Sequence, residues 1–248
     1  MTAAPLIEGP LIEGLLIEAR GLHTFYGESH ILHGVDFAVR PGEAVGLLGR
    51  NGMGKTTLLR SLLGLTPPRR GWVRVKGVAM TGAAPHRIAR RGIAFVPEGR
   101  GIFPGLSVRE HLVLAARPAR ESRAAWDLHR VLETFPRLKR RLALPGSLLS
   151  GGEQQMLTIG RALMANPDLI MLDEATEGLS PILAGEIWSI LRSLRQGGIA
   201  CVIVDKNFAA LSALADRCVV LGKGRVVLEG SAAALRKKRA TLHRHLGV

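Results

Sequence analysis

The sequence predicts an α/β fold: a mostly parallel sheet covered by helices, with an antiparallel β part at the N-terminus and a helical subdomain inserted in the middle. Three observations predict it. In the last third of the chain, short apolar runs typical of buried strands alternate with amphipathic helical patterns. Residues 15–48 are strand-like and contain turn signals. Residues 99–165 carry helical patterns alone, separated by prolines.

Each element can be placed along the chain. After the strand-like N-terminal part, whose turns are marked by Gly27 and Gly42, apolar or alternating runs predict strands at 44–48, 71–77, 93–96, 169–172, 199–204 and 218–221. Helical patterns begin at about Gly54 and recur at 108–116, 123–135 and 152–164, and in a segment with Leu183, Ile187, Ile190 and Leu194 on one face. We therefore expect strands and helices to alternate on both sides of the inserted helices.

Composition limits the class of protein. The chain has 248 residues, of which 47% are hydrophobic and 22% charged, so it is globular. Its net charge of +14 favours nucleotide, an anionic membrane surface or another polyanion as a partner. Aromatic residues make up only 4%, and the arginines are scattered, so we expect no nucleic-acid partner and favour membrane proximity.

The sequence also indicates where the protein works. No apolar run approaches the roughly 20 residues that span a bilayer, and the first residues do not resemble a signal peptide. We expect a chain that does not cross the membrane and lies in the cytosol. Cys201 and Cys218 stand in apolar runs without metal-ligand spacing, so we expect both to be buried.

A glycine-rich segment follows the predicted strand at 44–48. It fits the pattern G-x-x-x-x-G-K-[ST], in which glycines let backbone N–H groups approach phosphates, the lysine adds a mobile positive charge, and the hydroxyl of Thr56 can bind Mg²⁺. The helix that begins here points its positive end at the same phosphates. The candidate nucleotide-binding residues of this loop are Gly49, Arg50, Asn51, Gly52, Met53, Gly54, Lys55, Thr56 and Thr57.

Two carboxylates follow the buried strand at 169–172. In open α/β sheets, ligands bind at the carboxyl ends of the strands, so Asp173 is expected to hold Mg²⁺. Glu174 is expected to accept a proton from the attacking water as a general base. Together with the glycine-rich loop, this pair predicts hydrolysis of a nucleoside triphosphate.

A third segment, Leu-Ser-Gly-Gly-Glu-Gln-Gln at 149–155, lies between the other two. Ser150, Gly151 and Gly152 precede a helical pattern, so they predict a serine N-cap and a second site for an anion at a helix start. This segment closely resembles the signature of the ATP-binding cassette (ABC) family, and the resemblance covers nearly the whole chain. It implies that the signature of one subunit, with Gln154, closes on ATP bound by another, so that two chains form a dimer.

The resemblance extends to further positions and to a domain organisation. Tyr26 lies where an aromatic ring stacks on adenine, and Ser180 lies in a loop that crosses the dimer. We expect a P-loop NTPase cassette after a variable tail over 1–14. Its parts are a nucleotide-binding core (15–98 and 166–235), a helical subdomain (99–165) and a basic C-terminal helix (236–248), together spanning 15–248.

Two positions depart from the usual family pattern. Glu98 stands where the family generally has a glutamine that binds Mg²⁺, and we expect this carboxylate to ligate the metal more tightly. Lys206 replaces the usual switch histidine. A lysine can hold the γ-phosphate as a point charge, but it cannot act as a proton switch at neutral pH. We therefore expect it to contribute to catalysis.

The segment at 96–112, together with Val-Asp-Lys-Asn at 204–207, resembles an ATPase subunit of branched-chain amino-acid importers. That resemblance implies a peripheral protein on the cytoplasmic face of the membrane, docked to permease subunits near Glu98 to Leu112, with Arg100, Ile102 and Phe103 as candidate contacts. Importers of amides or urea, a lipid exporter, or a soluble cassette acting on an assembly or nucleic-acid partner remain alternatives. A DNA-acting cassette is disfavoured because no sustained heptads separate the loop from the signature.

Overall fold

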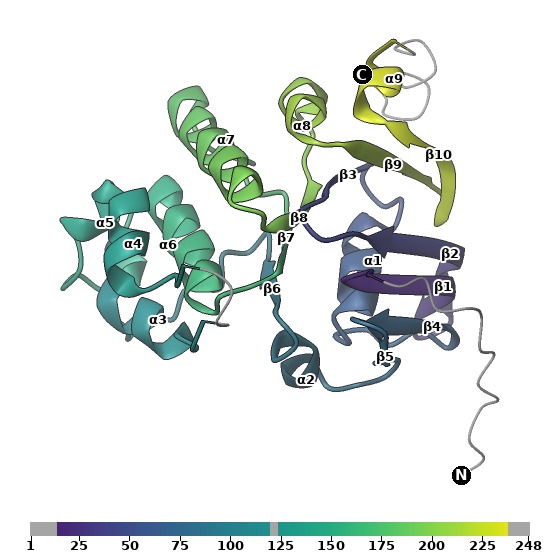
Figure 1. Ribbon diagram of the computed structural model, residues 1–248, viewed down its shortest axis with the longest axis horizontal. Coiled ribbons are helices and arrows are strands. Elements are labelled where there is room, and N and C mark those ends of the chain that lie inside the picture. Colours follow the sequence, from purple (N-terminus) through teal and green to yellow (C-terminus); the bar gives the residue numbers. More distant parts are fainter. Residues whose placement is uncertain (1–13, 120–123, 238–248) are drawn as a thin grey trace.

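The computed structural model describes residues 14–119 and 124–237 (Figure 1). The expected tail at 1–14 therefore lies outside the described residues except for Gly14. The expected C-terminal helix at 236–248 overlaps only the end of α9 (Ala232–Lys237), and its remainder is also outside them.

A six-stranded sheet forms the centre of the molecule, in the order β10-β9-β3-β8-β7-β6. β3, β6, β7, β8 and β9 pair with one another in the parallel sense, and β10 pairs with β9 in the antiparallel sense. The expected mostly parallel sheet is therefore present, and the edge strand β10 is an element that the patterns did not predict. The bounds are β3 (Ala44–Leu48), β6 (Ile93–Val96), β7 (Leu169–Asp173), β8 (Ala200–Val204), β9 (Arg217–Gly222) and β10 (Arg225–Ser231).

The N-terminal part forms a separate four-stranded antiparallel sheet in the order β2-β1-β4-β5, as expected for this region. Figure 1 shows this sheet beside α1 (Lys55–Leu62), which packs between it and the central sheet. The short β5, like β10, was not predicted. The bounds are β1 (Ile17–Tyr26), β2 (Ser29–Val39), β4 (Arg70–Val75) and β5 (Val78–Ala79).

Helices in the expected subdomain gather on one side of the molecule (Figure 1). The helix predicted at 123–135 starts later than expected. α4 begins at Leu128, because the side chain of Asp127 accepts a hydrogen bond from the backbone N–H of Arg130 and caps the helix. The bounds here are α3 (Val108–Ala115), α4 (Leu128–Thr134), α5 (Pro136–Lys139), the 3₁₀ turn η1 (Gly146–Leu148) and α6 (Gly151–Met164). The other helices are α2 (Pro85–Ala89), α7 (Pro181–Gln196) and α8 (Phe208–Leu214).

The parallel strands of the central sheet are buried on both faces, which explains why they are continuous apolar runs. In β7, Ile170 and Leu172 belong to the core that includes the helical subdomain and α7. Leu169 and Met171 belong to the core that includes α1 and the antiparallel sheet. Every residue of β7 is buried, and so are those of β3 and β8. The strand ends are therefore held rigidly, which fixes whatever side chains follow them.

Both cysteines are buried in this core, as expected. Burial raises the pKa of the Cys201 thiol to about 12 and that of Cys218 to about 11, so both stay protonated at neutral pH. They act as small apolar side chains.

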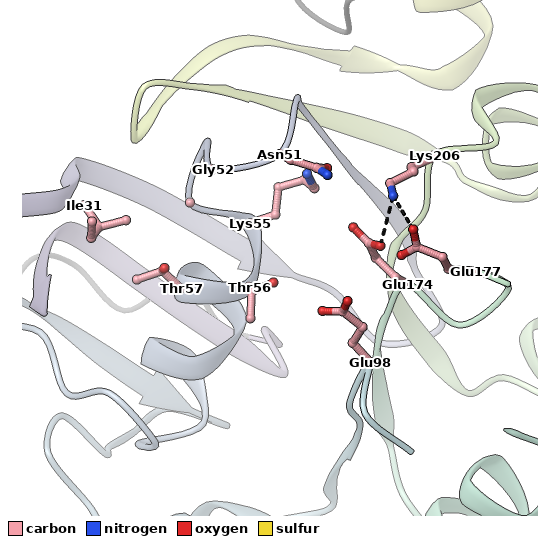
Figure 2. A pocket seen from close by; sticks show the side chains of 11 residues that line it. Ile31, Asn51, Gly52, Lys55, Thr56, Thr57, Glu98, Glu174, Glu177 and Lys206 are labelled. Atoms are coloured by element: carbon pink, nitrogen blue, oxygen red, sulfur yellow. Dashed lines mark hydrogen bonds and ion pairs between the residues drawn. The ribbon is translucent and has the colours of Figure 1, made fainter. Parts of the chain in front are cut away.

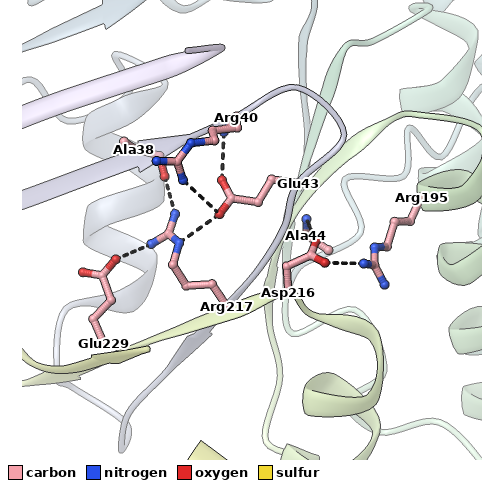
Figure 3. Close-up of polar contacts among 8 residues, drawn as sticks. All are labelled: Ala38, Arg40, Glu43, Ala44, Arg195, Asp216, Arg217 and Glu229. Carbon is pink, nitrogen blue, oxygen red and sulfur yellow. Dashed lines mark hydrogen bonds and ion pairs between the residues drawn. The ribbon is translucent and has the colours of Figure 1, made fainter. Parts of the chain in front are cut away.

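Charged groups connect the two sheets near the N-terminal end of β3 (Figure 3). Arg217 donates to Glu43 at 2.9 Å, to Glu229 at 2.7 Å and to the carbonyl oxygen of Ala38 in β2 at 2.7 Å. These contacts link β9 and β10 to the antiparallel sheet. Within 14–119 and 124–237, no helix has the length and apolar character that crossing a bilayer requires.

Candidate functional site

A pocket of about 370 Å³ lies where the glycine-rich loop faces the carboxyl ends of β6, β7 and β8 (Figure 2). One wall is made by Asn51, Gly52 and residues 54–57. The opposite wall comes from segments that follow three different strands of the sheet, and it carries Glu98, Glu174, Glu177 and Lys206. Of the predicted carboxylates, Glu98 and Glu174 are therefore brought to the predicted loop, as a ligand site at strand ends requires, whereas Asp173 does not line the pocket.

The glycine-rich loop is held by its own lysine. Lys55 Nζ donates to the carbonyl oxygens of Gly49 at 2.7 Å and Arg50 at 3.0 Å, so its ammonium stands inside the curve of the loop. Burial lowers the pKa of Lys55 and is the main cause of that shift. Gly49 has no room for a side chain, because an added Cβ would lie 2.5 Å from the carbonyl oxygen of Leu221. α1 begins next, after Gly54 in a left-handed conformation.

The helix start at α1 offers free donors. Its N-cap, Gly54, has no side chain to cap the first backbone N–H groups, and the first turn contains no acidic residue. These N–H groups and the helix dipole point toward the pocket, where Thr56 and Thr57 also face. This is the arrangement that binds a phosphate chain. Met53 does not line the pocket; its carbonyl oxygen accepts from Gly224 N at 3.2 Å.

Asp173 is almost completely buried at the end of β7, with 1% of its surface exposed. Burial raises the pKa of its carboxyl, while a hydrogen bond from the Thr56 side chain lowers it. Its Oδ1 atom has no hydrogen-bond partner among the residues that the structure describes. An orphaned carboxylate oxygen beside a hydroxyl, with Glu98 near enough to affect the same pKa, is a hard oxygen set that fits Mg²⁺.

The backbone at Glu174 is unusual. Its φ is +53°, a left-handed conformation that a glutamate seldom adopts and that costs about 1 kcal/mol or more. Glu174 N nevertheless donates to the carbonyl oxygen of Val204 at 2.9 Å, so pairing between β7 and β8 continues to this point. The residue is therefore fixed where the two strands end, with its carboxylate facing the pocket (Figure 2).

Lys206 completes this wall. Its Nζ lies 3.6 Å from Glu174 Oε2 and donates a hydrogen bond to Glu177 Oε1. Carboxylate oxygens of Glu98, Glu174 and Glu177 all lie within 4.8 Å of one another. The sequence pointed to Glu98, Glu174 and Lys206. It did not assign Glu177 to the pocket, because this residue was recognised only as the start of the loop at 177–181 that contains Ser180.

The signature segment lies elsewhere. Among the described residues that line the pocket, none comes from 149–155. Ser150 caps α6 as predicted, and it does so in a capping box: its Oγ accepts from Glu153 N at 3.4 Å, and Glu153 Oε2 accepts from Ser150 N at 2.9 Å. Gly151 and Gly152 open this helix. The two predicted anion sites are therefore separate within one chain.

Side chains pack closely against both signature glycines. A Cβ on Gly152 would lie 2.4 Å from Leu183 of α7, and one on Gly151 would lie 3.0 Å from the guanidinium of Arg100. Arg100 Nη1 also stands 3.5 Å from Gln154 Oε1. The contact of Arg100 with the signature was not predicted, because its position two residues after Glu98 suggested only a contact for a partner.

The segment after Glu98 is fastened to α6. Thr158 Oγ1 donates to the carbonyl oxygen of Arg100 at 2.7 Å, and Arg161 donates to the carbonyl oxygen of Gly101 at 2.7 Å. Phe103, a predicted partner contact, has 51% of its surface exposed. Thus one short loop joins a wall of the pocket to the helix that carries the signature.

Two other predicted residues lie outside the pocket. Tyr26 ends β1 and is 44% exposed, but the pocket is lined from this hairpin by Ile31, which the sequence did not single out. Ser180 caps α7, accepting from Leu183 N at 3.4 Å. Both side chains are accessible to a ligand or a second chain.

Comparison with known proteins agrees with this geometry. The sequence model of the family described as ABC transporter matches residues 32–177. The chain is 42% identical to the high-affinity branched-chain amino acid transport ATP-binding protein BraG of Pseudomonas aeruginosa, over 86% of this chain and 91% of that protein. It is 38% identical to the Nod factor export ATP-binding protein I of Rhizobium etli, over 83% of this chain and 65% of that protein.

A solved structure shows the same fold. The dimeric post-hydrolysis state of an ATP-binding cassette bound to ADP and Pi matches with a TM-score of 0.75 and 25% identity, covering 87% of this chain and 98% of that one. The P-loop NTPase cassette fold is thereby confirmed. From the family match, the relatives and the pocket, the chain belongs to the ABC transporter family and is an ATP-binding subunit with ATPase activity.

Proposed function

We propose that this chain is the ATP-hydrolysing subunit of a membrane importer for branched-chain amino acids. The observation that carries the proposal is its similarity to BraG over most of both chains. Glu98 and Lys206, at the two positions that depart from the usual family pattern, support the same branch. The protein would work as a peripheral subunit on the cytoplasmic face of the membrane.

Hydrolysis would use the two walls of the pocket. Lys55 and the free N–H groups at the start of α1 bind the phosphate chain. Thr56, Glu98 and Asp173 would hold Mg²⁺, which supplies charge neutralisation to the phosphate oxygens. Glu174 accepts a proton from water as the water oxygen bonds to the γ-phosphorus. The bond from that phosphorus to the β–γ bridging oxygen breaks, so the products are ADP and inorganic phosphate.

A second chain would complete the site. Because the signature segment does not line the pocket of its own chain, Ser150, Gly151 and Gly152 are free to close on the γ-phosphate bound by a partner subunit. Gln154 and Ser180 would lie at the same interface. ATP binding would close the dimer, and hydrolysis would reopen it. Permease subunits docked near Glu98 to Leu112 would receive this motion, because that loop is fastened to α6.

Native copurification followed by transport tests this proposal. Tagged chain is isolated from membranes of its source organism, the integral proteins that accompany it are identified, and the complex is placed in lipid vesicles with ATP and Mg²⁺ on the side of the ATPase. We expect ATP-dependent movement of labelled leucine, isoleucine or valine. Glu174→Gln should bind ATP but abolish movement. If a complex that hydrolyses ATP moves none of these amino acids, the assigned substrate is wrong.

The Nod factor export relative favours a second candidate, an exporter of a lipid-like substrate. The same vesicles distinguish the two, because an exporter moves its substrate away from the side where ATP is hydrolysed. Movement toward that side supports an importer.

A Glu174→Gln chain that stays monomeric with ATP, alone and with a candidate second ATPase, would contradict the dimer.

A further inference from the structure

Glu177 and Lys206 form an ion pair at the edge of the pocket, and the hydrolysis proposed above gives Glu177 no role. We propose that Glu177 is a positioning residue: it holds the ammonium of Lys206 beside Glu174, where the γ-phosphate of ATP would lie. The inference rests on the proposed function, ATP hydrolysis in this pocket, and on the expectation from the sequence that Lys206 holds the γ-phosphate as a point charge.

The geometry places one ammonium between two carboxylates (Figure 2). Lys206 Nζ donates to Glu177 Oε1 and lies 3.6 Å from Glu174 Oε2. The Lys206 and Glu177 side chains are 54% and 42% exposed, whereas that of Glu174 is 13% exposed. Glu177 therefore approaches Lys206 from the open side of the pocket, while Glu174 lies deeper.

The backbone under this pair is fixed. Glu174 N bonds to the carbonyl oxygen of Val204, the Thr176 hydroxyl donates to the Asp205 carboxylate, and Asn207 N donates to Asp205 Oδ1 at 2.8 Å. The segments that carry Glu177 and Lys206 are thus joined directly before each of the two residues, and the Asn207 bond fixes the turn around Lys206. The backbone therefore leaves only the rotamers of these two side chains to be set by their own contact.

A lysine at this position needs such a partner. Its ammonium is a point charge on a flexible stem, so an unpaired and half-exposed lysine would spend much of its time in solvent. An exposed ion pair contributes little to stability, so stability does not explain why Glu177 is there. Holding the lysine in advance removes part of the entropy cost of binding phosphate. The pair therefore serves preorganisation.

The charges of Lys206 and Glu177 also act on Lys55, which lies on the opposite wall of the pocket. Burial is the main cause that lowers the Lys55 pKa; the charge of Lys206 lowers it further, and the charge of Glu177 opposes this. The two lysines thus face one pocket, and Glu177 offsets the repulsion between them. A γ-phosphate between the two walls would be attracted by both ammonium groups. ADP, which lacks that phosphate, would gain little from Lys206.

A double-mutant cycle tests the inference on the full-length chain: wild type, Glu177→Gln, Lys206→Met and the double variant. The readouts are kcat and the ratio of the ADP dissociation constant to that of a non-hydrolysable ATP analogue, at saturating Mg²⁺. We expect each single variant to lower this ratio about tenfold and to lower kcat, with ADP affinity nearly unchanged. If Glu177 acts through Lys206, the double variant matches Lys206→Met alone.

Glu186→Gln is the matched control. It breaks the Arg137–Glu186 pair, whose side chains are 50% and 38% exposed, similar to the pair in the pocket. It should leave both readouts unchanged. Glu177→Asp, which keeps the negative charge, should have a ratio of dissociation constants close to that of the wild type.

Two outcomes would overturn the inference while leaving the ATPase assignment intact. In the first, Glu177→Gln has no effect on the ratio. In the second, the fold-changes of the two single variants multiply in the double variant. Multiplied effects would mean that Glu177 acts on the nucleotide or metal directly. A wild-type chain that binds neither ADP nor the analogue would instead contradict the proposed function itself. Folding of every variant is checked by its thermal unfolding, so a loss of structure cannot be mistaken for a loss of positioning.

Discussion

The start of α1 and the start of α6 are both helix N-termini expected to bind phosphate, yet they are built differently. At α1, Gly54 supplies no side-chain cap and no acidic residue follows in the first turn. At α6, Ser150 and Glu153 form a capping box, so the first N–H groups are already partly satisfied. A carboxylate at a helix start also weakens the attraction of the helix dipole for anions.

Arginines offset that carboxylate. Arg141 lies 3.7 Å from Glu153, and the guanidinium of Arg100 stands against Gly151. The start of α6 is thus stable without a ligand, whereas the start of α1 has donors that only a ligand or water can satisfy. We therefore expect the α1 half of the site to bind nucleotide without a partner. We expect the other half to act only when a second chain brings a phosphate to it.

The largest effect should come from the α1 half. Lys55→Ala removes the ammonium that stands inside the glycine-rich loop, and we expect kcat/KM for ATP to fall by at least about 100-fold. Nucleotide affinity should fall as well, measured by calorimetry on the isolated chain. Lys139→Ala, an exposed lysine of α5, should change neither value. If Lys55→Ala kept the wild-type affinity for ATP, the α1 half would not be the part of the site that binds nucleotide.

A smaller effect is expected from the α6 half. Ser150→Ala should lower kcat by about tenfold and destabilise the protein by about 1 kcal/mol through the lost cap, but it should leave ADP affinity unchanged. Asp127→Ala removes the cap of α4 and serves as the control for stability. It should lower the thermal midpoint similarly without changing kcat. Weaker ADP binding in Ser150→Ala would show that the two halves are not independent.

Glu98 lies on the loop that joins the halves. Glu98→Gln keeps the shape of the side chain and removes its charge, so we expect the Mg²⁺ concentration for half-maximal activity to rise several-fold. Phosphate release measured across a Mg²⁺ titration checks this. Unchanged Mg²⁺ dependence would mean that Glu98 serves the loop and not the metal.

The smallest effect should be at Tyr26. If its ring stacks on adenine, Tyr26→Ala should raise the KM for ATP by about threefold to tenfold, from the loss of about 0.5–1.5 kcal/mol of ring contact. Tyr26→Phe should keep the wild-type KM, since only the ring is needed. An equal loss in both variants would point to the hydroxyl and contradict stacking.

Much of the site could be predicted because its motifs are local. The glycine-rich loop, the Ser150 cap and the Asp173–Glu174 pair each occupy consecutive residues, and the elements that hold them are set by neighbouring apolar patterns. β10 was missed because only alternate residues of this edge strand are partly buried, so its apolar signal is weak. Helix α4 was placed too early because the cap at Asp127 outweighed the apolar pattern before it.

The order of residues along the chain supplies the chemical groups: a phosphate loop, a signature and two carboxylates. Which of these groups share a pocket follows from how distant segments pack. Parallel pairing of β7 with β8 places Asp173 opposite Val204, and this brings Glu177 to Lys206, 29 residues further along the chain. The same packing leaves Ser150 outside that pocket. Caps and turns depend on residues three or four apart, whereas these placements depend on strand register, which the local sequence does not encode.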